Sequence, residues 1–362
     1  MVVELAAARA AITALMARHH VPGLSVAVTD STGLLHAEGF GLRELATRAP
    51  ATPDTSYLWF SMSKIATATA AMRLVDEGRL DLDAPVDSLV PGFRARRGLP
   101  PVVRQLLDHT SGAPNPLPLR WVLPTDRAAT EAAPAAAALL ARHGRPRRAA
   151  GGPARYSNVG YLVLAEVIAA AAGQPFEDYV REAVLEPAGM SGTGYARPDA
   201  ADSATGYVRL PRPLDPLLRA ALPRGVTGPR CGGFVALESF RVVGAGYGGL
   251  VGSVTDAARL ARLHLGDGEI EGSRVLRPET AQRMRDIRTP GRPFDLGLGW
   301  FRQARDRGAR PSFVEHWGTG GGFWNAMRIY PGLDLGIVVM ANTTRPYDHH
   351  ALMKALREVF RP

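Results

Sequence analysis

Cysteine is almost absent from this chain, since Cys231 is the only one in 362 residues. A lone cysteine excludes an internal disulfide bond and any cysteine-rich metal site. Long apolar runs are missing too, because no stretch approaches the roughly 20 residues that span a bilayer. Residues 1–20 carry Glu4 and Arg9 and have the pattern of an amphipathic helix rather than of an export signal. The sequence therefore predicts a cytoplasmic protein with no membrane partner.

Lysine is nearly as rare, because Lys64 and Lys354 are the only two among 43 basic residues. A lysine retained in so arginine-rich a chain can mark a place where an amine must lose its proton, although chance explains Lys354 equally well. The formal net charge is +9, but the arginines are scattered, so we expect no nucleic-acid partner. The histidines lack the spacing of metal ligands, and we expect neither a metal nor a cofactor.

The pattern of apolar residues divides the chain into three regions. Strand-like segments occupy both ends, and helical or irregular segments dominate from about residue 62 to 235. We expect strands at 23–30, 33–40, 296–301, 313–317, 324–330 and 333–340, and helices at the amino terminus, from 60 to about 78, at 158–171 and at 347–360. These elements predict an α/β (α+β) fold, in which one antiparallel sheet from both chain termini is flanked by helices. The predicted domains are a discontinuous sheet domain, 1–85 and 236–362, and a mainly helical inserted domain, 86–235.

The segment F-S-M-S-K, residues 60–64, begins one of the predicted helices. Lys64 follows Ser61 by three residues, so the amine and the hydroxyl lie on one helix face within hydrogen-bonding reach. A lysine desolvated among apolar neighbours can be neutral and take the serine proton, and the free backbone N–H of Ser61 can stabilise an oxyanion. The alternative is that Ser61 only caps the helix and Lys64 is a surface residue, since S-x-x-K alone is a weak signal.

The segment Y-S-N, residues 156–158, directly precedes an apolar helical pattern. It places the phenol of Tyr156 and the amide of Asn158 two residues apart on a turn, where both side chains can point into a cleft. The alternative is structural, with Asn158 capping the helix and Tyr156 packed beneath it.

A third motif, H-W-G-T, residues 316–319, ends one predicted strand of a glycine-rich hairpin. His316 and Gly318 border a strand edge against which a substrate can lie, and the backbone N–H of Thr319 can supply a second oxyanion donor. A lone histidine at a strand end, however, is more often structural.

The three motifs S-x-x-K, Y-x-N and H-x-G, in this order, are far more specific together than any one alone. With them the chain resembles the serine β-lactamase and penicillin-binding protein superfamily, and within it the class C β-lactamase-like branch of esterases, D-amino-acid peptidases and acyltransferases. The resemblance covers nearly the whole chain and includes the segment L-L-D-H-T-S-G, residues 106–112.

This resemblance implies a role for each motif residue. It implies that Ser61 forms an acyl-enzyme, and that Lys64 and Tyr156 share its proton and pass one to the leaving group. It further implies that Asn158 orients Lys64 and the acyl side chain. The backbone amides of Ser61 and Thr319 would form the oxyanion hole.

The third motif departs from the family pattern of K-T-G or K-S-G. His316 replaces the lysine that helps hold a carboxylate, and Trp317 replaces the small hydroxyl residue. A largely neutral histidine, and a tryptophan that fills the carboxylate site, argue against efficient penicillin turnover and favour esters or amides without a C-terminal carboxylate. H-x-G nevertheless also occurs in branch members that act on D-amino-acid peptides.

Two further features bear on specificity. The Pro/Arg-rich loop 207–230 could overhang the cleft. Four aromatic residues could line an apolar acyl pocket or could simply belong to the core: Trp121, Trp317, Phe323 and Trp324.

The stretch V-V-G-A-G-Y-G-G, residues 242–249, has the G-x-G-x-x-G register of a dinucleotide-binding loop. Such a loop requires a parallel β-α-β unit whose helix begins within the glycines. The next helical pattern begins only near Thr255 or Asp256. We therefore interpret the stretch as a close-packed structural segment and expect no bound dinucleotide.

The leading functional hypothesis is a serine hydrolase that acts on small esters or amides, with a small-molecule substrate as its expected partner. An acyltransferase of a natural-product pathway would use the same acyl-enzyme. A β-lactamase, a D-aminopeptidase or a D-Ala carboxypeptidase is a further alternative. A non-catalytic binding protein is the last one, and the complete set of motif residues weighs against it.

Overall fold

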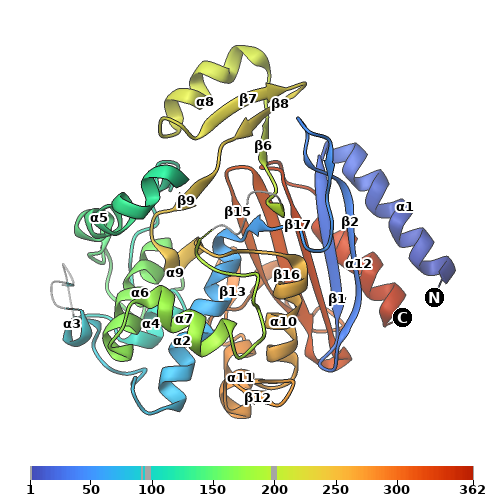
Figure 1. Ribbon diagram of the computed structural model, residues 1–362. Helices are drawn as coiled ribbons and strands as arrows, with labels where there is room; N and C mark the ends of the chain where they lie inside the picture. The colour runs from blue at the N-terminus through green and yellow to red at the C-terminus, as the bar shows by residue number, and fades with distance from the viewer. Residues whose placement is uncertain (1, 91–92, 94–98, 197–201, 362) are drawn as a thin grey trace.

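One antiparallel sheet, drawn from both ends of the chain, forms the frame of the molecule (Figure 1). The computed structural model describes residues 2–90, 93, 99–196 and 202–361. The sheet has eight strands in the order β13-β14-β15-β16-β17-β1-β2-β3. Because β17 pairs directly with β1, the predicted fold class is confirmed. The strands are β1 (Gly23–Thr29), β2 (Leu34–Glu44), β3 (Ala49–Pro50), β13 (Phe294–Leu296), β14 (Phe301–Gln303), β15 (Val314–Gly320), β16 (Phe323–Tyr330) and β17 (Leu335–Ala341).

Helices cover both faces of this sheet. On one face lie α1 (Val2–His19) and α12 (His349–Phe360), and on the other lies α10 (Val254–Leu265) (Figure 1). Successive side chains of a strand point to opposite faces, so Val26 and Val28 join the core beneath α1 and α12, whereas Ala27 joins the other core. β17 is buried throughout, which explains its uninterrupted apolar run.

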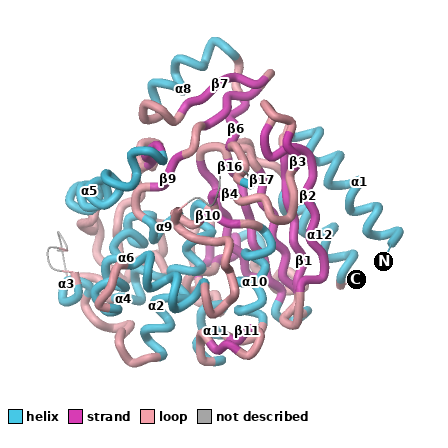
Figure 2. The backbone as a smooth tube through the Cα atoms, in the orientation of Figure 1, coloured by secondary structure: helices cyan, strands magenta, loops and turns pink. Residues whose placement is uncertain are grey.

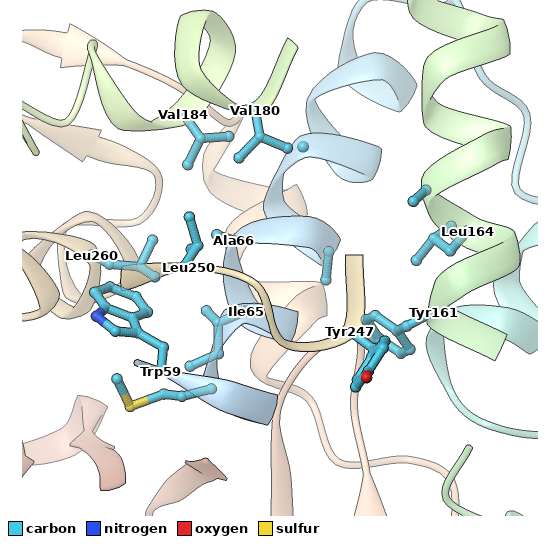
Figure 3. Packing of buried hydrophobic residues seen from close by; sticks show 14 of the residues in the cluster. Trp59, Ile65, Ala66, Tyr161, Leu164, Val180, Val184, Tyr247, Leu250 and Leu260 are labelled. Carbon is cyan, nitrogen blue, oxygen red and sulfur yellow. The ribbon is translucent and has the colours of Figure 1, made fainter. Parts of the chain in front are cut away.

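The helical layer is built around α2 (Lys64–Asp76), which follows a single 3-10 turn, η1 (Phe60–Ser63). Figure 3 shows Ile65 and Ala66 of α2 among buried apolar side chains from distant segments, with Tyr161 beside Tyr247. The predicted helix at residues 60–78 is thus present, although its first turn is a 3-10 turn. The other helices of this layer are α3 (Val86–Leu89), α4 (Val103–Leu107), α5 (Thr125–His143), α6 (Asn158–Ala172) and α7 (Phe176–Val180), followed by a π-helical turn, η2 (Arg181–Leu185).

Within the described residues, no single helix is long and apolar enough to cross a membrane. The consecutive segments Asn158–Ala172 and Phe176–Leu185 reach that length and composition only together, across a bend of 79°. Most of α6 is buried in the protein core.

Short elements complete the fold around the helical layer. They are β4 (Tyr57–Leu58), β5 (Val122–Pro124), β9 (Phe240–Val242), α9 (Ala245–Gly248), β10 (Val251–Gly252), β11 (Glu269–Ile270), β12 (Ser273–Arg274), α11 (Pro278–Arg285), η5 (Ala304–Asp306) and η6 (Pro331–Leu333).

A small sheet at residues 206–237, which we call the cap (Gly206–Leu237), lies above the main sheet (Figures 1 and 2). Its strands are β6 (Gly206–Arg209), β8 (Phe234–Leu237) and β7 (Thr227–Cys231), in that spatial order, and its helices are η4 (Arg212–Leu214) and α8 (Asp215–Ala221). The prediction of a loop at 207–230 is therefore wrong. Pro229 lies at an irregularity of the β7–β8 ladder, where it removes no regular hydrogen bond. The backbone N–H of Tyr207 donates to the Gly322 carbonyl (3.3 Å), which ties the cap to the β15–β16 turn.

The strand predicted at 296–301 is instead a hairpin, because β13 ends at Leu296 and β14 begins at Phe301. Gly299 has a φ of +85°, a conformation that glycine adopts without steric strain. Leu296 and Phe301, on opposite sides of the turn, are both buried, so the apolar pattern continues in sequence although the strand does not.

Candidate active site

Ser61 lies in η1, the 3-10 turn that connects β4 to α2. The preceding residue, Phe60, has a φ of +48°, which is uncommon for any residue other than glycine. Such strained backbone persists only where the surrounding packing holds it, and it is concentrated at functional sites. Because Ser61 belongs to the first turn of a helix, its backbone N–H has no carbonyl one turn earlier to bind. Both its hydroxyl and its amide are therefore positioned for a ligand.

Lys64 has no exposed surface, and its amine contacts three neutral oxygen atoms. Nζ lies 3.1 Å from Ser61 Oγ and contacts Asn158 Oδ1 (2.8 Å) and the Tyr247 carbonyl (2.8 Å), so a neutral amine can donate to the latter two and direct its lone pair at Ser61. No carboxylate forms an ion pair with Lys64 among the residues described. Burial lowers the pKa of this amine well below its usual value of 10.5. The site therefore favours a neutral amine that can accept the proton of Ser61.

Tyr156 lies above the lysine, with its ring centroid 4.9 Å from Lys64 Nζ, and its hydroxyl hydrogen-bonds the Ser61 side chain. Burial raises the pKa of this phenol, which keeps it protonated at neutral pH. The His109 ring packs against the Tyr156 ring with 4.5 Å between centroids, and His109 Nδ1 accepts from the Ser157 backbone N–H (3.1 Å). His109 therefore supports Tyr156 from behind, a role that sequence reasoning did not assign.

Asn158 is the first residue of α6, but it is not the cap of that helix. The N-cap is Ser157, whose hydroxyl accepts from the Gly160 N–H (3.0 Å). The Asn158 side chain is thereby left to accept from Lys64, while its backbone N–H donates to Asn115 Oδ1 (3.0 Å). The alternative in which Asn158 caps the helix is therefore wrong.

The end of β15 lies against η1, and glycine makes this approach possible. A Cβ atom at Gly318 would lie 1.7 Å from the Trp59 carbonyl oxygen, and one at Gly320 would lie 2.2 Å from the Phe60 ring. Within the described chain, β14 pairs with β15 through a single residue pair, Phe301 with Glu315. The backbone from His316 to Gly320 thus has an open edge, and Thr319 lines the same cavity as Ser61.

His316 and Trp317 point to opposite faces of β15. The buried His316 ring lies 6.1 Å from the Tyr156 ring, and burial lowers its pKa to about 3, so the imidazole is neutral. The Trp317 ring packs 4.9 Å from His349 of α12. The expectation that Trp317 fills a carboxylate site is therefore wrong, because strand alternation turns this ring away from Ser61.

A cavity of about 430 Å³ opens beside Ser61. Its lining includes the cap residues Val208, Leu218, Leu222 and Val226, so the predicted overhang by residues 207–230 is correct. Four aromatic residues were predicted to line an acyl pocket, and that prediction is wrong. None of them belongs to the cavity wall, and they pack against the protein core instead: Trp121, Trp317, Phe323 and Trp324.

The stretch V-V-G-A-G-Y-G-G forms part of the site without forming a nucleotide loop. β9 leads into it, but β9 pairs antiparallel with β5, and the helical turn α9 within the glycines is only four residues long. A Cβ atom at Gly246 would lie 2.6 Å from the Tyr161 carbonyl oxygen, which shows the close packing that was predicted. This packing presents the Tyr247 carbonyl to Lys64, a contact that the glycine spacing alone did not indicate.

One cluster could in principle hold a cation on the α12 side of β15. Potential ligand atoms of Glu315, His349 and His350 lie within 4.8 Å of one another. The Arg328 guanidinium, however, donates to Glu315 Oε2 (2.6 Å) and contacts His350 Nδ1 (2.6 Å). Arg328 thus already provides the positive charge there, and the cluster has no contact with Ser61.

Known proteins resemble this chain over nearly its full length. The sequence model of the family described as Beta-lactamase matches residues 8–359. "Penicillin-binding protein 4" of Amycolatopsis lactamdurans is 28% identical over 346 residues, which cover 91% of this chain and 83% of that protein. The D-alanyl-D-alanine-carboxypeptidase/endopeptidase AmpH of Escherichia coli K12 is 26% identical over 298 residues, covering 77% of this chain and 69% of AmpH. The structure of the octameric penicillin-binding protein homologue from Pyrococcus abyssi shares the fold, with a TM-score of 0.80 at 24% identity over 98% of this chain and 77% of that one.

Proposed function

The chain belongs to the beta-lactamase family, and from this premise we propose that it hydrolyses small esters or amides through an acyl-Ser61 intermediate. The observation that carries the proposal is the environment of Lys64. The amine is fully buried, contacts only neutral oxygen atoms, and lies 3.1 Å from the hydroxyl that it would deprotonate. A buried lysine with a lowered pKa is suited to activating a serine nucleophile.

In the proposed reaction, the Ser61 proton moves to Lys64 as Oγ attacks the carbonyl carbon of the substrate. The backbone amides of Ser61 and Thr319 stabilise the negative charge on the former carbonyl oxygen. The proton then passes through the Tyr156 hydroxyl to the leaving group, and the bond between carbonyl carbon and leaving group breaks. Water then attacks the acyl carbon as its proton passes to the same relay, the bond between the acyl carbon and Ser61 Oγ breaks, and the relay returns the proton to Oγ as the acid leaves.

Two residues position the proton relay of Ser61, Lys64 and Tyr156 without belonging to it. Asn158 fixes Lys64 through its side-chain oxygen, and Gly318 allows β15 to reach the oxyanion position. His316 is neutral and cannot replace the lysine that holds a carboxylate in typical β-lactamases. This supports ester or amide substrates without a C-terminal carboxylate over penicillins or D-Ala-terminated peptides.

An acyltransferase is the second candidate, because the cap covers the cavity beside Ser61. A covered acyl-enzyme can exclude water and wait for an alcohol or amine. Acyl-Ser61 that accumulates in buffer and clears only when an alcohol or amine is added would establish this candidate in place of the hydrolase.

Covalent labelling tests the proposal directly. The protein is incubated with a fluorophosphonate or with a p-nitrophenyl ester, and intact-mass and peptide mass spectrometry locate the adduct. We expect one adduct on Ser61 in the parent and none in Ser61→Ala. No adduct on the parent protein would refute both enzymatic functions and favour a binding protein.

A further inference from the structure

We infer that the cavity beside Ser61 binds a linear aliphatic acyl chain, so that the substrates are esters or amides of aliphatic carboxylic acids. This inference rests on the proposed function and names the acyl group that Ser61 receives. A cavity of about 430 Å³ is within the range of small-molecule sites.

The cavity wall is apolar, with the rings of Phe60, Phe240 and Tyr247 beside a larger set of aliphatic side chains. The cap supplies Val208, Leu218, Leu222, Val226 and Leu237, and the segment before α5 supplies Leu117, Pro118, Leu119 and Val122. Among the residues that the structure describes, the wall contains neither an arginine nor a carboxylate. A wall without a charged partner disfavours an ionised acyl group and favours methylene groups.

The proton relay indicates that this cavity receives the acyl part. Ser61, Asn158 and Thr319 line it, so a carbonyl at the oxyanion position projects its substituent into it. Tyr156, the proposed proton donor to the leaving group, lines this cavity and also a second one of about 530 Å³. The second cavity, whose lining includes His109, Arg147, Arg148 and Arg155, does not include Ser61. Assigning the first cavity to the acyl group leaves the Tyr156 side of the site for the leaving group.

Helix α8 of the cap has apolar side chains on two sides. Leu218 and Leu222 line the cavity, whereas Leu217 has 66% of its surface exposed and is absent from the lining. Leu117 also lines the cavity while remaining 76% exposed. The cavity is thus apolar both in its buried wall and where its lining reaches the surface.

Two substrate series test the assignment. In the first, p-nitrophenyl acetate, butyrate, hexanoate, octanoate and decanoate vary the acyl chain on a constant leaving group. In the second, ethyl, butyl, hexyl and octyl acetate vary the alcohol on a constant acyl group. Each buried methylene raises kcat/KM about fourfold, which corresponds to about 0.8 kcal/mol. We expect kcat/KM to rise more than a hundredfold from acetate to octanoate in the first series, and less than fivefold in the second.

Variants of the cap identify the cavity that is responsible. Leu218→Asp and Leu222→Asp place a carboxylate on the wall and should lower the octanoate-to-acetate ratio of kcat/KM at least tenfold. Leu222→Trp shortens the cavity and should move the optimum to butyrate. Leu217→Asp, a neighbour on the same helix outside the cavity, is the matched control and should leave the ratio within twofold. Thermal melting of each variant verifies that the cap remains folded.

The outcomes separate this inference from the proposed function. A flat acyl series with a Ser61 adduct on every ester overturns the aliphatic chain but keeps the acyl-enzyme. A steep alcohol series with a flat acyl series overturns the assignment of the cavity to the acyl side. An octanoate-to-acetate ratio of kcat/KM that is unchanged in both Leu218→Asp and Leu222→Asp would show that the cap does not bind the acyl chain. No hydrolysis of any ester together with no adduct on Ser61 overturns the proposed function itself.

Discussion

Replacing Lys64 by arginine keeps the positive charge and the hydrogen-bond donors but removes the capacity to act as a base. Lys64 Nζ lies 3.1 Å from Ser61 Oγ in a site that holds no carboxylate partner for it among the described residues. Arginine remains protonated at every accessible pH, so it cannot accept the serine proton. General-base catalysis contributes about 10² to 10⁴ in rate. We expect Lys64→Arg to lower kcat/KM for p-nitrophenyl octanoate by at least about 10³, near the effect of Ser61→Ala.

The same substitution also has a predictable effect on stability. Burial lowers the pKa of Lys64 and favours its neutral form, whereas a guanidinium in its place would be a buried charge facing neutral oxygen atoms. Burying an ion without a partner costs several kcal/mol, so the melting temperature of Lys64→Arg should fall. Lys64→Met removes the base without adding a charge, and should be as inactive as Lys64→Arg but more stable than it.

The chain contains its own control for this experiment. Lys354, the second lysine, is 70% exposed on α12 and lies 3.9 Å from Glu358. Lys354→Arg should leave both activity and melting temperature unchanged. The assay is steady-state release of p-nitrophenol, with differential scanning fluorimetry for stability. Activity of Lys64→Arg within tenfold of the parent would refute the role of Lys64 as the base.

Three further predictions follow from individual contacts. Protonation of Lys64 removes the base, and burial places its pKa well below 10.5, so kcat/KM should rise with pH to a plateau whose midpoint lies well below that value in a pH-rate profile. Gly318→Ala places a Cβ atom 1.7 Å from the Trp59 carbonyl and should displace β15 from the oxyanion position, lowering kcat about 10²- to 10³-fold in steady-state assays. Glu315→Gln leaves the buried Arg328 guanidinium without its counter-charge and should destabilise the fold by about 3–5 kcal/mol in urea denaturation.

Each of these predictions has a matched control. His316 has a pKa of about 3 and is already neutral, so His316→Gln should leave the midpoint of the pH profile in place; a moved midpoint would assign the profile to His316 instead. Gly332→Ala meets no atom within 4 Å and should be neutral, and equal losses in Gly332→Ala and Gly318→Ala would contradict the steric explanation. Glu358 is 51% exposed, so Glu358→Gln should lower the free energy of unfolding by less than about 1 kcal/mol. An equally small loss in Glu315→Gln would show that the buried pair of Glu315 and Arg328 stabilises the fold no more than an exposed pair does.

Several features of the site could be predicted from the sequence because they depend on local spacing. Lys64 lies three positions after Ser61, which is close to one helical turn, and Asn158 lies two positions after Tyr156 on the turn before a helix. The apolar run at 333–340 likewise predicted the strand that the structure shows as β17. Local geometry of this kind follows from the periods of helices and strands, whatever the rest of the chain does.

Other features depend on contacts between segments far apart in the chain. The Tyr247 carbonyl reaches Lys64 across 183 residues, and His109 meets the Ser157 amide across 48. The dinucleotide-like glycines let α9 approach α6, in agreement with their interpretation as a close-packed segment, but the helix that they approach could not be identified from their spacing. The direction of Trp317 followed from the register of β15, which one residue of shift would have reversed.

The sequence by itself determined which chemical groups were available and which of them were one turn apart. Only the tertiary structure decided that Lys64 is buried without a counter-charge among the described residues, and that Leu218 and Leu222 of the cap line the cavity beside Ser61 while the four predicted aromatic residues do not. The physical reason is that the pKa of an amine and the shape of a cavity depend on every segment packed around them. The candidate nucleophile can therefore be identified from a local motif, whereas its environment is a property of the whole fold.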